Sequence, residues 1–279
     1  MTGSLIIVAT PIGNLDDLSP RAAKALAEAD LIACEDTRVT RKLLTRVAGS
    51  TPMMSYRSAN EAQKAAELVA RIEAGETVAL VTDAGTPGVS DPGHLLVDAC
   101  AQRGIPINVV PGPSAAVAAL VASGLPTARF VFEGFLPHTR TARRKRLEAL
   151  AREERTLVLF EAPHRLKTTL ADISDVLGDR RIAMAREMTK IHEEFFRSTV
   201  SGLQARVGER GVKGEVTLVI EGAPDHGEEK QQFDDADLVE MVRARIGAGA
   251  SRRDAIDFVA DETGLPRRRV YQATIDAKV

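Results

Sequence analysis

The feature that most constrains the fold is the alternation of short apolar segments with helical segments over the first 125 residues. The apolar segments carry hydrophobic residues at consecutive positions, which is typical of strands buried on both faces. We predict strands at Leu5–Ala9, Leu31–Cys34, Met53–Ser55, Thr77–Thr82 and Ile105–Val110. We predict helices at Arg21–Ala29, Thr40–Arg46, Asn60–Ala74, Gly93–Arg103 and Ser114–Ser123. This order predicts an α/β domain, a mostly parallel sheet covered by helices.

The pattern changes after Gly124–Thr127, which we interpret as a linker. Predicted strands then follow one another with fewer long helices between them, which indicates a second α/β domain with a mixed sheet. These strands are Phe130–Phe135, Thr156–Glu161, Arg181–Arg186, Glu193–Val200 and Val216–Glu221, and the helices are Arg143–Arg152, Leu166–Leu177 and Gly202–Gly208. A polar segment, 225–232, should be a mobile linker. Three short helices, Asp237–Arg245, Arg252–Thr263 and Pro266–Ala277, should form a helical appendage. The predicted domains are 1–123, 124–225 and 233–279.

Composition excludes several classes of protein. The net charge of −2 means that any contact with nucleic acid must come from local basic patches. Two distant cysteines and five histidines without ligand spacing predict no structural metal. No apolar run approaches the roughly 18 residues of a membrane span. The first apolar segment is too short for a secretory signal, so we expect a cytoplasmic protein.

The sharpest functional signal is the segment Thr82–Gly93, which follows a buried strand and precedes a helix. Ligands bind at such strand ends in open α/β sheets. Its glycines permit a close approach of a ligand to the backbone, and its prolines fix the loop. The segment is longer than the usual two to six residues of such a connection. We therefore predict a ligand-binding loop here rather than a tight turn.

Polar segments follow three other strands of the first half. Thr10–Leu15 is not a dinucleotide fingerprint, and the sequence contains no Walker A motif. Glu35–Arg38 offers two acids beside an arginine, which suits either a general base or a surface ion pair with a helix cap. Ser114, in Pro111–Ala116, could cap a helix or contact a ligand. These alternatives stay open on the sequence.

Charged segments in the second half also follow strands. Glu161–Arg165 and Arg186–Glu194 each contain a histidine that could act as a base, although lone histidines are more often surface residues. The basic run His138–Arg146 could grip a phosphate backbone or be a solvated helix face. The helical appendage adds Arg252–Arg253 and Arg267–Arg269 around a helix–turn–helix-like rhythm. Local basic patches are thus present despite the negative net charge.

Taken together, seven motifs resemble, in order and spacing, the ribosomal RNA small-subunit methyltransferase I group of the tetrapyrrole-methylase-like superfamily. The motifs are Thr10–Leu15, Glu35–Arg38, Asp83–Gly93, Pro111–Ala115, Glu161–Arg165, Glu187–Glu194 and Lys213–Gly222. The resemblance implies two α/β domains with S-adenosylmethionine in the cleft between them. It implies methylation of a cytidine 2′-hydroxyl in the decoding region of 16S rRNA, by a homodimer acting on the small ribosomal subunit.

The resemblance also implies site residues. The expected donor contacts, mostly through the backbone, are Pro11, Ala84, Gly85, Thr86, Ser114, Ala115, Phe160, Glu161, Gly214, Glu215 and Val216. Many members carry a histidine before the Asn-Glu pair that matches Asn60-Glu61, where this chain has Ala59. That departure argues against an indispensable histidine base.

An alkyl hydroxyl ionises poorly at neutral pH, so transfer to it calls for a base or a strong positive field. Our first candidate is Asp36, oriented by Arg38, with Lys190 and Glu187 as second choices. The Asp36→Asn variant should therefore lose turnover and retain donor binding. The predicted RNA anchors are Arg143, Arg144, Lys145 and Arg165.

Two rival functions follow from the same sequence. The first is methylation of a small tetrapyrrole, against which the basic run and the helical appendage argue. The second is a non-enzymatic RNA-binding or ribosome-assembly factor. Polar loops at several strand ends argue against this second function, because a pure binder needs no deep donor site.

Overall fold

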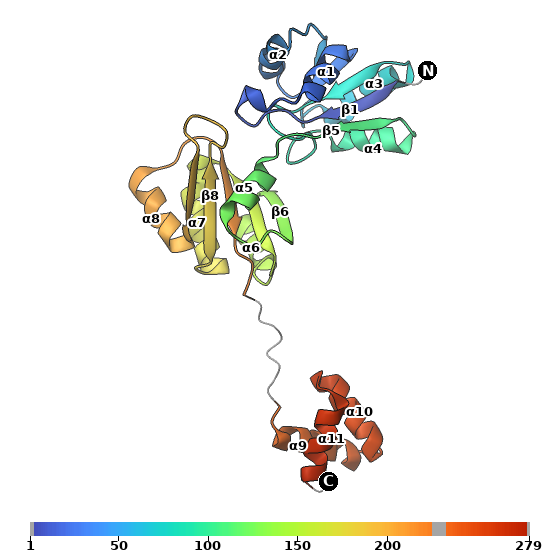
Figure 1. Ribbon diagram of the computed structural model, residues 1–279, viewed down its shortest axis with the longest axis vertical. Helices are drawn as coiled ribbons and strands as arrows, with labels where there is room; N and C mark the ends of the chain where they lie inside the picture. Colours follow the sequence, from blue (N-terminus) through green and yellow to red (C-terminus); the bar gives the residue numbers. More distant parts are fainter. Residues whose placement is uncertain (1–2, 225–232, 278–279) are drawn as a thin grey trace. The chain divides into compact units, whose positions relative to one another are not determined.

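The computed structural model describes residues 3–224 and 233–277, so the predicted linker 225–232 lies outside the described residues. The chain divides into two compact units, Met1–Ala223 and Pro224–Val279. The first unit contains two five-stranded sheets (Figure 1). We call residues 3–110, around the first sheet, the first lobe, and residues 115–223, around the second sheet, the second lobe.

The first lobe is built on a parallel sheet, as predicted. Its strands are β1 (Ser4–Val8), β2 (Leu31–Cys34), β3 (Met53–Ser55), β4 (Thr77–Leu80) and β5 (Ile107–Val110). They lie in the order β3-β2-β4-β1-β5 with parallel pairing throughout. Because all five strands point the same way, the loops after them meet at one edge of the sheet.

Helices cover both faces of this sheet. They are η1 (Leu15–Asp17), α1 (Pro20–Glu28), α2 (Thr37–Arg46), α3 (Glu61–Glu73) and α4 (His94–Gln102). Strand β2 shows the consequence for burial. Leu31 and Ala33 pack in one hydrophobic cluster and Ile32 and Cys34 in another, so all four residues are buried. This explains why the sequence of β2 is continuously apolar.

Helix starts follow capping chemistry. Ser19 accepts a hydrogen bond from the Ala22 N–H at 3.1 Å, and Pro20 occupies the first turn of α1, as predicted. The Glu61 carboxylate accepts hydrogen bonds from the backbone N–H groups of Gly93 (2.9 Å) and Leu95 (3.2 Å). A carboxylate at a helix N-terminus is favourable. Glu61 therefore fixes the end of the glycine-rich loop to α3.

The second lobe has the predicted mixed sheet. Its strands are β6 (Phe130–Phe135), β7 (Thr156–Glu161), β8 (Arg181–Arg186), β9 (Glu194–Thr199) and β10 (Val216–Ile220). They lie in the order β6-β7-β10-β8-β9; β6 and β7 are parallel, and the other three pairings are antiparallel. The main core of this lobe involves α6 (Arg140–Ala149), α7 (Pro163–Leu177) and α8 (Val200–Arg210).

Helix α5 (Ala115–Ser123) packs against the second sheet, not the first. Ala119 and Leu120 share a core with Val158 of β7 and Val219 of β10. The sequence predicted the end of the first domain at residue 123, on the evidence of a glycine-proline linker. Because α5 buries its small apolar residues on the second sheet, we propose that the two lobes divide at residues 111–114.

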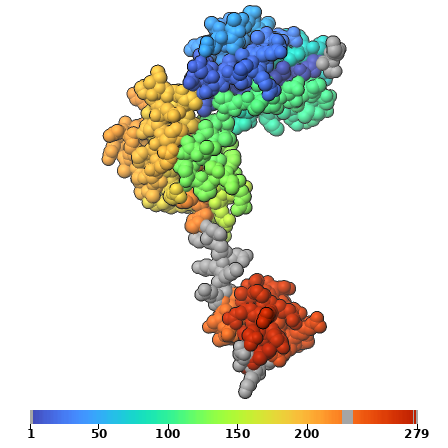
Figure 2. All heavy atoms as spheres, viewed as in Figure 1, coloured from blue at the N-terminus to red at the C-terminus, as the bar shows by residue number. Residues whose placement is uncertain are grey.

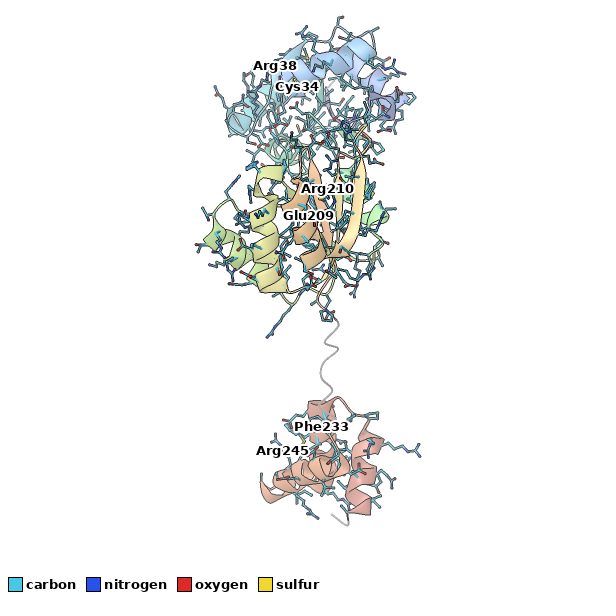
Figure 3. The ribbon with its side chains drawn as sticks, turned by 90° about the vertical axis from the view of Figure 1, so that its left-hand side faces the viewer. Cys34, Arg38, Glu209, Arg210, Phe233 and Arg245 are labelled. Atoms are coloured by element: carbon cyan, nitrogen blue, oxygen red, sulfur yellow. The ribbon has the colours of Figure 1, made fainter. Side chains whose placement is uncertain are left out.

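The second unit is a small helical bundle, so the predicted C-terminal helices are present. It contains α9 (Asp235–Gly247), α10 (Arg252–Thr263) and α11 (Arg267–Asp276) around its own apolar core. The Arg245 guanidinium, labelled in Figure 3, lies 3.4 Å from the ring centroid of Phe258. None of the helices in the described ranges is long and apolar enough to cross a membrane.

Candidate functional site

The glycine-rich loop is joined to the loop after β1. Thr10 and Gly85 form an antiparallel bridge through two backbone hydrogen bonds of 2.9 and 3.1 Å. The buried Thr10 hydroxyl also donates to the carbonyl of Thr82 at 3.1 Å. Gly85 has a φ of +84°, a conformation that favours glycine. Two motifs whose bridged residues lie 75 positions apart in the sequence therefore form one wall.

A cavity of about 360 Å³ opens between this wall and the second lobe. Ten of the eleven predicted donor contacts line it; the exception is Pro11, which lines a neighbouring cavity. The residues lining it are Ile12, Ala84, Gly85, Thr86, Val89, Ser90, Asp91, Ser114, Ala115, Phe135, Phe160, Glu161, Ala162, Pro163, Gly214, Glu215, Val216 and Thr217. The Ser114 side chain makes no capping hydrogen bond to α5. Ser114 thus lines the cavity without a side-chain cap, and its contact with a ligand stays a prediction.

The cavity combines aromatic edges with carboxylates. Phe135 and Phe160 meet edge to face with ring centroids 5.6 Å apart, and Phe135 is half exposed. Burial raises the pKa of Asp91 to about 6. The Glu161 carboxylate is buried and accepts hydrogen bonds from the Thr169 hydroxyl (2.6 Å) and the Ala162 N–H (2.8 Å). Such a cavity suits a ligand with a flat ring system and positive charge.

Glu187 and Lys190 hold the wall of the cavity that comes from the second lobe. The Glu187 carboxylate accepts hydrogen bonds from the Glu215 N–H and the Lys190 ammonium, both at 2.9 Å. Lys190 also pairs with the Glu215 carboxylate at 3.1 Å. Gly214, with a φ of +87°, packs directly on Glu187. The structure therefore places Glu187 and Lys190 behind the cavity wall formed by Gly214 and Glu215.

The protonation of Glu187 and Lys190 does not suit a general base. Hydrogen bonds from the Glu215 backbone and from Lys190 lower the pKa of Glu187. Burial of Lys190 lowers its pKa, but its hydrogen bonds to Glu187 and Glu215 outweigh that effect and raise it. Glu187 therefore stays ionised with little affinity for a proton, and Lys190 has no free pair to accept one.

Asp36, the first candidate for the base, caps a helix. Its carboxylate accepts a hydrogen bond from the Arg38 N–H at 2.8 Å and pairs with the Arg38 guanidinium at 2.6 Å. These bonds hold the pKa of Asp36 well below its usual range. The Arg38 side chain is 86% exposed at the surface of α2 (Figure 3). The cap-and-ion-pair alternative therefore describes this motif, and we no longer propose Asp36 as the base.

The predicted RNA anchors differ in availability. Arg143 is buried, with its guanidinium 2.7 Å from Asp172, so it is not open to a phosphate and that prediction is wrong. Arg165 is also largely buried and donates to the carbonyls of Leu136 and Pro137. Arg143 finds its acid 29 residues away in the sequence, whereas Arg165 pairs with the nearby Glu161 at 3.4 Å and is held by the more distant carbonyls.

The other two anchors remain available. Arg144 is partly exposed and pairs with Asp175 at 2.7 Å. Lys145 is exposed and makes no hydrogen bond or ion pair within the described ranges. We therefore keep Lys145 as the stronger proposed RNA contact, with Arg144 beside it.

Some cavity residues were missed by the sequence analysis. Asp91 and Ser90 lie in the predicted loop but were not singled out. Their position as polar residues between Pro87-Gly88 and Pro92-Gly93 was a usable signal. Phe135 ends β6 beside Phe160. No three histidine, cysteine, aspartate or glutamate side chains among the described residues form a group that could hold a metal ion.

The comparisons with known proteins agree with this architecture. The family model for Tetrapyrrole (Corrin/Porphyrin) Methylases matches residues 4–204. A uroporphyrin-III-C-methyltransferase from Thermus thermophilus superimposes with a TM-score of 0.56 at 24% identity, covering 81% of this chain and 98% of that one. A diphthine synthase superimposes with a TM-score of 0.59 at 16% identity, covering 78% of this chain and 90% of that one. These likenesses concern the fold.

Sequence relatives narrow the family. A Synechocystis protein named ribosomal RNA small subunit methyltransferase I is 47% identical over 98% of both chains. A Bacillus subtilis protein with the same name is 40% identical and covers 97% of this chain and 94% of its own. The identity thus extends through the second unit. The chain is therefore an α/β methyltransferase of the tetrapyrrole methylase fold, and it belongs to the ribosomal RNA small subunit methyltransferase I family.

Proposed function

We propose that this protein transfers a methyl group from S-adenosylmethionine to the 2′-hydroxyl of a cytidine in the decoding region of 16S rRNA. The observation that carries the proposal is the cavity between the lobes, lined by ten of the eleven predicted donor contacts. The names of the relatives support small-subunit rRNA as the substrate. The resemblance of the seven motifs supplies the position of the methyl group. We propose that the reaction takes place in the cytoplasm, on the small ribosomal subunit.

The cavity residues fit this donor. When bound, S-adenosylmethionine supplies an activated methyl group on a positively charged sulfur. Asp91 provides negative charge for a cationic ligand, whereas the charge of Glu161 is paired with Arg165 at 3.4 Å. The edges of Phe135 and Phe160 provide an apolar contact for an adenine ring. Gly85 lets the backbone approach a ligand closely. The same cavity offers no cationic side chain that would repel the donor among its lining residues.

The chain's remaining task is to align the acceptor oxygen and remove its proton. Glu187 and Lys190 contribute by holding the Gly214–Glu215 wall in place. Lys145 and Arg144, on α6, would contact phosphates of the rRNA. Such contacts depend on salt and do not read the sequence.

We also propose that the protein is a homodimer. Four large apolar residues are exposed on β5, α5 and β6: Val109 (53%), Val117 (49%), Val121 (70%) and Phe130 (38%). β5 and β6 are edge strands of their sheets. The segment from β5 through β6, in green, runs across the visible face in Figure 2. Burying exposed apolar side chains and unpaired sheet edges away from water is favourable, and a second copy of the chain would bury them. Sedimentation of the Val121→Asp variant as a monomer would support this interface, and an unchanged dimer would remove it.

The test of the proposed function uses three acceptors with the same labelled donor. The acceptors are assembled small subunits lacking the modification, naked 16S rRNA and a uroporphyrinogen-type tetrapyrrole. The proposal predicts transfer to the small subunit at least tenfold faster than to the other two. Transfer to the tetrapyrrole alone would favour the first rival function. Absence of donor binding by calorimetry, together with no transfer to any acceptor, would favour an RNA-binding factor.

A further inference from the structure

A second cavity, of about 330 Å³, adjoins the donor cavity. Three residues line both: Ile12, Ala84 and Glu215. A ligand in the second cavity therefore lies next to the donor cavity. The two cavities together provide neighbouring places for two reactants, as a transfer reaction requires.

The walls of the second cavity suit a nucleotide. Its apolar side includes Leu15 and Val39, which are 45% and 39% exposed in the absence of a ligand. Lys42 also lines the cavity, is exposed, and makes no hydrogen bond or ion pair in the described part of the chain. Apolar side chains can pack against a base, and an unpaired ammonium can bind its phosphate.

Asp83 supplies a carboxylate to this cavity, next to the shared residue Ala84. One of its oxygens accepts a hydrogen bond from the Asp36 N–H at 3.0 Å, which orients the group. Burial raises the pKa of Asp83, and the nearby carboxylates of Glu35 and Asp36 raise it further, so it binds a proton more readily than Asp36 does. Asp91 also has a raised pKa, but it lines the donor cavity alone.

We propose that the second cavity is the subsite for the acceptor nucleotide, where Lys42 binds a phosphate and Asp83 accepts the proton of the reacting 2′-hydroxyl. This inference rests on the proposed function and assigns its acceptor side. As the oxygen–methyl bond forms, the sulfur–methyl bond breaks and its electron pair stays on the sulfur, which becomes neutral. The hydroxyl proton passes to the Asp83 carboxylate and from there to solvent, so charge and atoms balance.

The phosphate contact is tested with neighbouring residues of α2. Lys42 lines the cavity and Arg41 does not, although both are exposed and positively charged. Lys42→Glu and Arg41→Glu therefore change the net charge of the protein equally. We expect Lys42→Glu to lower kcat/KM for small subunits at least tenfold, mainly through KM, and Arg41→Glu to lower it less than threefold. Donor affinity, measured by calorimetry, should be unchanged in both. Equal effects of the two variants would overturn the subsite.

The proton acceptor is tested by comparing Asp83→Asn with Asp36→Asn. General bases contribute about 10²–10⁴-fold to rate, so we expect Asp83→Asn to lower kcat by at least 10²-fold with unchanged donor affinity. Asp36→Asn should lower kcat less than tenfold. A larger loss in Asp36→Asn, or turnover above half of wild type in Asp83→Asn, would overturn the assignment. Failure of the proposed function is distinct, because the wild-type enzyme would then transfer no methyl group to small subunits.

Discussion

We predict that an alanine at Gly214 displaces Glu187 and weakens donor binding. Gly214 and Gly211 both have positive φ values, +87° and +64°. A Cβ atom on Gly214 would lie 2.4 Å from the carboxyl carbon and Oε1 of Glu187, whereas one on Gly211 would meet no described atom within 4 Å. Gly214→Ala and Gly211→Ala therefore both place a Cβ atom at a positive φ, and only the first displaces Glu187.

The magnitude follows from the bonds that Glu187 would lose. A Cβ atom at a positive φ costs about 1–3 kcal/mol in either variant. In Gly214→Ala, Glu187 also releases the Glu215 N–H and the Lys190 ammonium, both at 2.9 Å. Hydrogen bonds to charged groups contribute about 1.5–3 kcal/mol each, and because these groups are partly exposed we take about 3 kcal/mol for both. If donor binding must supply about half of this free energy to reorder the cavity wall, donor affinity falls about tenfold.

The assay is calorimetric titration of S-adenosylmethionine into both variants, with circular dichroism to establish that each is folded. We expect Gly214→Ala to bind the donor at least tenfold more weakly than Gly211→Ala. Glu187→Ala loses the same two hydrogen bonds without adding a Cβ atom at a positive φ, and should weaken binding to a similar extent. If Gly214→Ala binds the donor as tightly as Gly211→Ala, Glu187 does not support the donor cavity, and the reasoning is refuted.

Three further predictions follow from other contacts. In Gly13→Ala the new methyl group would meet the loop Met188–Lys190 at 2.6–3.0 Å, which costs about 1–3 kcal/mol of strain. The melting temperature should therefore fall by several degrees, and donor affinity should fall with it. An unchanged melting temperature would contradict the contact. Arg143→Ala removes the buried partner of Asp172 and leaves it only Arg140 (3.1 Å) and Arg144 (3.5 Å), so urea unfolding should show a loss of about 1.5–3 kcal/mol, and an unchanged stability would contradict the contribution of the buried pair. The pKa of Asp91 is raised from 3.8 to about 6 on folding, so its stabilising contribution is complete below about pH 4 and lost as the pH rises through 6. Asp91→Asn should therefore melt like wild type near pH 4 and be about 1–2 kcal/mol more stable at pH 8 without donor, a difference discounted for partial exposure; a gap that narrows with rising pH contradicts this sign.

Much of the fold could be predicted because a strand that is buried on both faces has apolar residues at consecutive positions of the sequence. β2 is apolar at every position since both of its faces are covered, and its predicted range matches the structure. Helix starts were less accurate. α2 begins three residues before the predicted Thr40, because Asp36 caps it, and the sequence had left Asp36 open between a helix cap and a general base. A capping residue and a catalytic acid share the same residue types, so local pattern alone does not separate them.

The partners of individual side chains were not predictable in the same way. Arg143 pairs with Asp172, 29 residues away, and Asp83 receives the Asp36 N–H across 47 residues. Neither pairing leaves a periodic signal. One hint existed for Arg143, which lies four residues before the buried Leu147 and therefore on the same face of α6. The charge of the basic run suggested RNA, whereas its helical spacing indicated which arginine would be buried.

The central claim is tested most directly by nucleoside mass spectrometry of 16S rRNA after reaction of the wild-type enzyme with unmodified small subunits and labelled S-adenosylmethionine. We predict one labelled product, 2′-O-methylcytidine, recovered from a single fragment of the decoding region. We also predict that the Lys42→Glu variant forms less of this product while binding the donor normally. Label on a base atom, on a different nucleoside, or on no nucleoside would contradict it.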